Sequence, residues 1–224
     1  MDLIYIRNTG MRSAAAARNV GVDSSRGDIV LFLDNDVVLE RNFIEEILRV
    51  FMEKADAIGV AGYITNIQAK RSALRDFFSF VFRTHYRYPV NRCRLLEYPA
   101  VLTRIIECEW LNGGTSAYRK EIFREFKFDE NLKGYSYMED VLFSHSIFKK
   151  YPGSLFMTPH ARCIHKVSPK NYEDNWALEE HKRRCRKYVL VRLYGMKGLL
   201  LYYWQNIGLT LINFTKKLKI SICE

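Results

Sequence analysis

The sequence predicts an α/β fold with a mostly parallel sheet flanked by helices, because strand and helix patterns alternate through its first 61 residues. Short apolar runs at Leu3–Ile6, Asp28–Leu33 and Ala57–Ala61 are typical of strands, and the second is uninterrupted, as expected of a strand covered on both faces. Between them lie the alanine-rich segment Met11–Ser25 and Asn42–Met52, whose apolar residues recur at i, i+4 spacing. Both segments favour helices. Such alternation predicts right-handed βαβ units.

The middle of the chain is harder to assign. Residues 66–105 are basic and aromatic without a clear period, so either a surface helix or an insertion over an active site fits them. Beyond this segment the expected elements are a strand over Glu107–Tyr118 broken at Gly113-Gly114, a short helix from Arg119, a helix over Glu139–Lys150 and a strand over Leu155–Thr158, ended by Pro159.

We divide the chain into an α/β domain, residues 1–174, and a helical tail, residues 175–224. The tail combines a cationic cluster (Lys182, Arg183, Arg184, Arg186, Lys187) with an uncharged stretch at 198–215. This stretch fits a helix packed on the domain, a helix in the membrane interface, or a bilayer span of minimal length.

Charge is unevenly distributed along the chain, whose net charge is +10. The basic segments 70–104 and 162–224 predict an anionic partner, which can be nucleotide phosphates, an anionic lipid surface or nucleic acid. The basic tail favours an anionic membrane surface. No recognised nucleic-acid motif accompanies the charge, so we expect no nucleic acid. Five cysteines without CxxC spacing indicate reduced thiols, and no signal peptide is recognisable. We therefore expect a cytoplasmic protein peripheral to the cytoplasmic face of the membrane.

Asp34 and Asp36 directly follow the strand predicted at Asp28–Leu33. In open α/β sheets, ligands bind beyond the carboxyl ends of the strands. Residues i and i+2 of an extended chain project to one side, so both carboxylates can meet one hard cation, Mg²⁺ or Mn²⁺. The alternative is that the aspartates only cap a turn.

Other candidate residues have structural alternatives too. Arg18 can bind phosphate as a guanidinium fork, or Arg18 and Asn19 can simply tie a helix end to a loop. Glu139 and Asp140 open a predicted helix, where carboxylates are stabilising, but one of them can also serve as a general base. His165 is either a structural histidine or a further ligand of a carboxylate metal site. No serine-nucleophile elbow or phosphate-binding P-loop is present.

Four motifs in order resemble the family-2 glycosyltransferases of the GT-A fold, most of all their rhamnosyltransferase-like branch. They are Asn8-Thr-Gly with Ala17-Arg-Asn-Val-Gly21 and Gly27–Asp36; Trp110–Arg119; Phe128-Asp-Glu with Tyr137-Met-Glu-Asp140; and Pro159 with Ile164-His165. The resemblance extends over residues 3–195.

The resemblance implies a role for each matching residue. Asp34 and Asp36 form the D-x-D motif that holds a metal ion and the nucleotide diphosphate, and His165 is the third metal ligand. Asp140 is the catalytic base, supported by Glu139. The remaining residues contact the nucleotide (Arg18, Asn19) or line the donor-sugar and acceptor side (Trp110, Asn112, Gly113, Gly114).

The implied reaction is inverting, metal-dependent transfer of a sugar from a UDP- or dTDP-linked donor to a saccharide or lipid-linked acceptor. Members of the family begin with a further βα unit that holds the base and ribose, about 40 to 60 residues judged by the usual size of such units. This unit is not recognisable before Leu3. The alternative expectation is therefore a truncated, non-catalytic remnant that acts as a binding or membrane-associated module.

Overall fold

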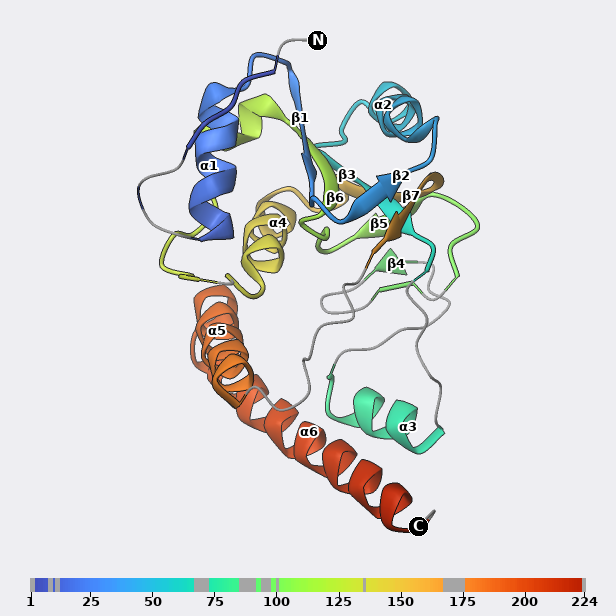
Figure 1. Cartoon of the computed structure of the whole chain (residues 1–224), viewed down its shortest axis with the longest axis vertical. Coiled ribbons are helices and arrows are strands. Elements are labelled where there is room, and N and C mark those ends of the chain that lie inside the picture. Colours follow the sequence, from blue (N-terminus) through green and yellow to red (C-terminus); the bar gives the residue numbers. More distant parts are fainter. Residues whose placement is uncertain are drawn as a thin grey trace.

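The computed structural model describes residues 3–7, 10, 13–66, 73–84, 92–93, 98–99, 101–134, 136–166 and 176–222. Its centre is one seven-stranded sheet with helices on both sides (Figure 1). The sheet follows the order β1 (Ile29–Leu33), β6 (Thr115–Arg119), β3 (Gly59–Ile64), β7 (Leu155–His165), β5 (Ile106–Cys108) and β4 (Arg92–Cys93), with β2 (Val37–Leu39) paired to β7.

The α/β class is confirmed, but the expected predominance of parallel pairing is wrong. Only β3–β7 and β4–β5 pair in parallel among the described strands; the other four pairings are antiparallel. The cause is β6, which lies between β1 and β3 and runs antiparallel to both. Strands β1 and β3 therefore point the same way, as βαβ units require, but a strand from much later in the chain separates them.

Two strand predictions need correction. Leu3–Ile6 forms no strand, and its side chains are 43–93% exposed, because no neighbouring strand in the described part of the chain covers this run. Strand β7 does not end at Pro159 but continues to His165. The register of β7 against β3 shifts between Ala61 and Tyr63, and an irregularity of this kind accommodates a proline without an amide hydrogen.

Helices α1 (Ala14–Ser24) and α4 (Glu139–Lys150) lie on one side of the sheet and α2 (Phe43–Glu53) on the other (Figure 1). All three confirm predicted helices, and α4 matches the prediction at both ends. The Ser13 hydroxyl caps α1 by accepting a hydrogen bond from the Ala16 amide at 3.1 Å. The short helix expected after Arg119 is a 3₁₀ helix, η1 (Lys120–Arg124).

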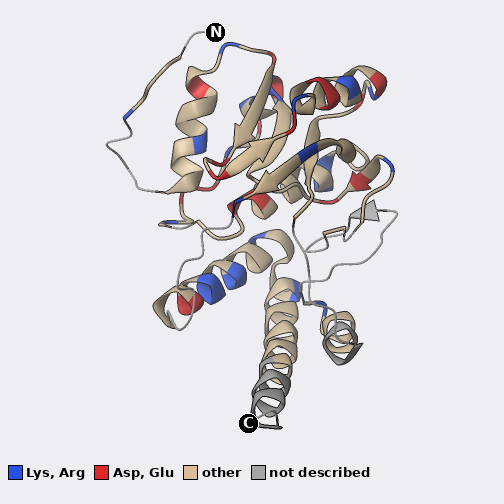
Figure 2. Ribbon diagram, turned by 45° about the vertical axis from the view of Figure 1, so that its right-hand side comes forward, with Lys and Arg blue, Asp and Glu red and all other residues tan. Residues whose placement is uncertain are grey.

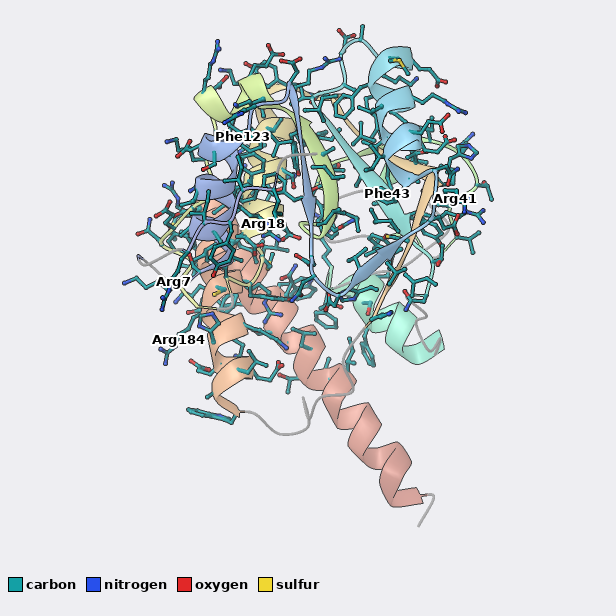
Figure 3. All side chains as sticks on the ribbon, turned by 45° about the horizontal axis from the view of Figure 1, so that its top comes forward. Arg7, Arg18, Arg41, Phe43, Phe123 and Arg184 are labelled. Atoms are coloured by element: carbon teal, nitrogen blue, oxygen red, sulfur yellow. The ribbon has the colours of Figure 1, made fainter. Side chains whose placement is uncertain are left out.

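An aromatic cluster fixes α4 and η1 against the sheet. Phe32 of β1 and Tyr118 of β6 meet Phe143 of α4, Phe123 of η1 and the loop residue Phe128. The Phe128 and Phe143 rings stack with centroids 4.1 Å apart. Figure 3 shows Phe123 on this side of the molecule and Phe43 of α2 on the other. The cluster therefore places the first turn of α4 close to the end of β1.

The rest of the chain extends below the sheet in Figure 1. Helix α5 (Trp176–Tyr194) packs on α4 through Val189 and Leu193, and α6 (Met196–Ile222) follows it after Gly195. Helix α3 (Ala73–Val81) lies beside α6, so a helix does occur in the basic segment 66–105. No helix in the described part of the chain is both long enough and apolar enough to cross a bilayer.

Candidate active site

The Asp34-Asn35-Asp36 turn joins β1 to β2. The Val37 amide donates to the Asp34 carbonyl at 3.2 Å, which closes the turn. Strand β2 then pairs antiparallel with β7, and Val37 stands opposite His165. This register brings the Asp36 side chain next to that of His165, with 3.1 Å between Asp36 Oδ1 and His165 Nε2.

Asp34, Asp36 and His165 can hold one metal ion. One ligand atom from each lies within 4.8 Å of the others. Asp36 Oδ1 is buried, and apart from its ion-pair contact with His165 Nε2 it has no polar partner among the described residues, so a cation between the two side chains would satisfy it. Asn66 bonds both the carbonyl and the amide of His165, at 2.7 and 3.0 Å, and thereby fixes this end of β7. Two carboxylates and an imidazole suit a divalent ion such as Mn²⁺ or Mg²⁺.

Arg18 connects the aspartate turn to α4. It projects from α1 (Figure 3) and is 13% exposed. Its Nη2 lies 3.4 Å from Asp34 Oδ1 and donates to the Gly113 carbonyl at 3.2 Å, while Nη1 pairs with Glu139. The guanidinium also lies over the Phe128 ring, 5.6 Å from its centroid. The Arg18 guanidinium thus connects three segments of the site: the aspartate turn, the Gly113 loop and the start of α4.

Asp140 lies across the Gly113 backbone from Arg18. Its two carboxylate oxygens accept hydrogen bonds from the amides of Gly113, at 2.9 Å, and Val141, at 2.8 Å. Burial raises the pKa of Asp140 above the ordinary aspartate value, although the charge of Arg18 and these two amides act to lower it. The negative charge of Asp34 adds a smaller contribution to the rise of this pKa. A carboxylate with a raised pKa is suited to accept a proton.

The backbone before α4 adopts an unusual conformation. Ser136 and Met138 have φ values of +48° and +68°, in the left-handed region that residues other than glycine rarely occupy. The buried Ser136 hydroxyl donates to the Leu132 carbonyl at 2.7 Å and accepts from the Ala14 amide at 3.1 Å, which holds this turn on α1. Strain of this kind is found at functional sites, and this turn directly precedes Glu139, which pairs with Arg18. No sequence pattern predicted it.

The Trp110–Gly114 loop forms another wall of the site. The Asp34 amide donates to the Gly114 carbonyl at 3.2 Å, so the loop is tied to the aspartate turn. The Asn112 side-chain oxygen accepts from the Thr115 hydroxyl at 2.6 Å, while its buried Nδ2 has no hydrogen-bond partner among the described residues. Trp110 is partly buried between the two apolar clusters of the domain.

Both glycines of this loop leave space for a charged side chain. A Cβ atom added at Gly113 would lie 2.7 Å from Arg18 Nη2, and one added at Gly114 would lie 2.4 Å from Asp34 Oδ2. Real Cβ atoms essentially never approach another atom so closely. The glycines therefore let the two charged side chains approach the loop backbone.

Most of the site residues predicted from the sequence lie in this one region; Asn19 has a different environment. Its amide bonds both backbone polar groups of Phe128 at 3.0 Å and Glu130 at 2.8 Å. These contacts tie α1 to the loop before α4, and a nucleotide contact by Asn19 stays a prediction. Sequence reasoning missed Asn66, because a single asparagine after a strand carries no signal of its own.

Comparison with known proteins identifies the family. Residues 1–127 match the model of glycosyl transferase family 2, which is more than half of the chain. The chain therefore belongs to this family, which confirms the resemblance to family-2 glycosyltransferases; the rhamnosyltransferase-like branch stays a prediction. No curated protein sequence matches the chain significantly.

Solved structures of glycosyltransferases share the fold. Glucosyl-3-phosphoglycerate synthase from Mycobacterium tuberculosis, in complex with phosphoglyceric acid, aligns with a TM-score of 0.50 at 15% identity, over 85% of this chain and 57% of that one. GalNAc-T7 with UDP, GalNAc and Mn²⁺ aligns with a TM-score of 0.52 at 13% identity, over 80% of this chain and 35% of that one. The chain thus spans less than two thirds of either protein. These likenesses establish the GT-A architecture.

Proposed function

We propose that this chain transfers a sugar from a nucleoside diphosphate sugar to a hydroxyl group of an acceptor, with inversion at the anomeric carbon. One observation carries the proposal. The partly buried Asp140 carboxylate and the Asp34–Asp36–His165 cluster are joined through Arg18 and the Gly113-Gly114 backbone.

The cluster is the proposed site of Mg²⁺ or Mn²⁺, with Asp34, Asp36 and His165 as ligands. Such an ion, when bound, would stabilise the negative charge that develops on the leaving diphosphate. Mycobacterial glucosyl-3-phosphoglycerate synthase in complex with Mn²⁺, UDP-glucose and phosphoglyceric acid shares this fold with a TM-score of 0.50. This supports a UDP-linked donor, and a dTDP-linked donor is the alternative.

Asp140 is the proposed general base. Its carboxylate takes the proton of the acceptor hydroxyl, whose oxygen attacks the anomeric carbon from the face opposite the diphosphate. Glu139 supports Asp140 indirectly: it pairs with Arg18 and holds the guanidinium beside Asp34. Arg18 and Asn19 are the proposed nucleotide contacts, and preorganised charge of the kind that Arg18 carries is a main source of catalysis.

The Trp110–Gly114 loop is the proposed wall of the sugar and acceptor site. Asn112 has a buried amide nitrogen without a partner among the described residues, and a sugar hydroxyl would satisfy it. Trp110 is the proposed aromatic contact in the same loop, and Gly113 and Gly114 let Arg18 and Asp34 lie against the loop backbone. The acceptor is a saccharide or a lipid-linked saccharide.

Asp140→Asn tests the proposed base. We expect transfer to fall by about 10²- to 10⁴-fold, the usual contribution of a general base, while binding of Mn²⁺ and UDP stays nearly unchanged. Nucleoside diphosphate release from a panel of UDP- and dTDP-sugars measures transfer, and titration calorimetry measures binding. Asp56→Asn removes an exposed carboxylate elsewhere and serves as the control. Equal loss of transfer and binding would show that Asp140 is structural, whereas binding without transfer by the unaltered chain would favour a non-catalytic module.

A location at the cytoplasmic face of the membrane accompanies this proposal, because lipid-linked acceptors reside there. The supporting feature is α5, whose Lys and Arg residues lie beside an uncharged stretch of α6 (Figure 2). Washing membranes first with high salt and then with detergent separates an electrostatic contact from an apolar one.

A further inference from the structure

Helix α6 exposes its apolar side chains. Those that are 37–72% exposed recur at intervals of three and four residues, which places them on one face of the helix. We name them the α6 stripe: Met196, Leu200, Tyr203, Trp204, Ile207 and Leu211.

The opposite face of α6 buries polar groups. Gln205 is 2% exposed and donates to the Arg83 carbonyl at 2.7 Å, and Asn206 accepts a hydrogen bond from the largely buried Arg186 of α5. The packed face thus contains polar groups beside the buried Tyr202 and Ile212, while the outward face is mainly apolar. A water-facing helix instead has a polar outward face.

Close backbone contacts fix the rotation of α6. A Cβ atom added at Gly198 would lie 1.9 Å from the Leu190 carbonyl oxygen, and one at Gly208 would lie 2.2 Å from Phe82 Cβ. Only glycine fits at these two positions, so α6 packs against α5 and the end of α3 along its glycine face. The helix cannot turn its apolar stripe inward without losing both contacts.

Helix α3 adds aromatic surface next to the stripe. Trp204 donates from its indole nitrogen to the Val81 carbonyl at 3.0 Å, and its ring lies 4.7 Å from that of Phe82. On α3 itself, Phe77 and Phe80 are 59% and 69% exposed. Helices α3 and α6 therefore present aromatic and aliphatic side chains on the part of the molecule farthest from the sheet (Figure 1).

The charge of the C-terminal segment indicates that the α6 stripe binds an anionic surface. Residues 181–223 contain ten Lys or Arg and no Asp or Glu, so they carry the whole net charge of +10, and the remainder of the chain is neutral. In the structure, Lys187 of α5 lies over the rings of Tyr202 and Tyr203, at 6.0 and 5.8 Å. Tyr203 is 53% exposed, whereas Tyr202 is buried. A cation beside an exposed aromatic ring is typical of helices that bind anionic lipid.

We infer that the α6 stripe inserts into the interface of an anionic membrane, with α6 lying along the surface. The inference deepens the proposed function, on which it rests for the place of a lipid-linked acceptor. The stripe supplies apolar contact, and the cations around it supply attraction to phosphate headgroups. A helix in the interface plane also agrees with the absence of any spanning helix from the described residues.

Flotation with vesicles tests the stripe in the full-length chain. We expect co-flotation with vesicles of phosphatidylcholine containing phosphatidylglycerol, and much weaker binding to pure phosphatidylcholine. Leu200→Glu combined with Ile207→Glu removes two exposed apolar contacts and adds two negative charges, so binding should fall by at least about tenfold. The control is Met52→Glu, the same kind of change at an exposed position on α2.

Fluorescence quenching, the oligomeric state and flotation of an active-site variant complete the test. Brominated lipid should quench tryptophan fluorescence in the unaltered chain, and Trp204→Phe should remove part of that quenching. Unchanged flotation of the Leu200→Glu, Ile207→Glu variant would overturn the inference. The inference would also be overturned if the unaltered chain formed a dimer without lipid and the double variant were a monomer. The stripe would then bind a second copy of the chain. Flotation needs neither metal nor nucleotide sugar, so Asp140→Asn should float normally even if the proposed reaction proves wrong.

Discussion

Gly114→Ala perturbs the proposed metal site without replacing a metal ligand. The added Cβ would lie 2.4 Å from Asp34 Oδ2, whereas ordinary contacts begin at 3.4 Å. The methyl group cannot retreat, because the Asp34 amide is bonded to the Gly114 carbonyl and β6 begins at the next residue. The carboxylate must therefore move by about 1 Å, several times the roughly 0.2 Å by which metal–ligand distances vary.

A displacement of this size should weaken Mn²⁺ binding by about 10- to 100-fold, the usual effect of disturbing the groups around metal ligands. Folding stability should change little, because the Asp34 side chain is 48% exposed and can move into solvent. Titration calorimetry of Mn²⁺ in the presence of UDP measures the first effect, and thermal unfolding measures the second.

Gly21→Ala is the matched control for Gly114→Ala. Nothing lies within 4 Å of a Cβ added at Gly21 in α1, so this variant should bind Mn²⁺ normally. It should also be more stable by about 0.5–1 kcal/mol, because alanine favours a helix over glycine. If Gly114→Ala bound Mn²⁺ as tightly as Gly21→Ala does, the assignment of Asp34 as a ligand would be refuted.

Three further predictions concern the same site. Asp36→Ala should abolish the Mn²⁺ dependence of UDP binding, and retained dependence would argue against a metal at this turn. Transfer should decline as pH falls through the raised pKa of Asp140, because the base must be ionised. Arg18→Gln should move this decline to higher pH, since the guanidinium charge lowers the pKa of Asp140. An unshifted pH–rate profile in Arg18→Gln would contradict that coupling. Asn66→Ala should weaken Mn²⁺ binding by about tenfold, because it frees the backbone of His165, and equal affinity in calorimetry would show that β7 alone fixes this residue.

The sequence allowed prediction of features that depend on local patterns. An unbroken apolar run predicted strand β1. Asp34 and Asp36 follow it at the end of the strand, where ligands bind in open α/β sheets. The helix over Glu139–Lys150 was predicted to the residue, because charges and apolar periodicity mark both ends.

Features set by distant parts of the chain were not predictable. The insertion of β6 between β1 and β3 depends on pairing between residues more than 50 positions apart, and no local pattern records it. Leu3–Ile6 has the composition of a strand, but a strand forms only where a neighbour offers a partner. The left-handed backbone conformation at Met138 could not be predicted from the sequence, because methionine rarely adopts that conformation.

The composition of the helical tail does not determine how the tail packs. The uncharged stretch at 198–215 was compatible with a packed helix, an interfacial helix or a span. The structure shows that one face of α6 packs through its glycines, Gln205, Tyr202 and Ile212, while the other stays exposed and mainly apolar. That division arises from contacts with α3 and α5, which hydropathy alone does not contain.

The most direct test is anomalous diffraction from crystals of the protein soaked with Mn²⁺ and UDP. A manganese peak should lie at about 2.0–2.2 Å from a carboxylate oxygen of Asp36 and from Nε2 of His165, with Asp34 in contact, and with Asp140 facing the same cavity. A manganese peak at another place, or none at saturating Mn²⁺ and UDP, would contradict a metal centre at these three residues.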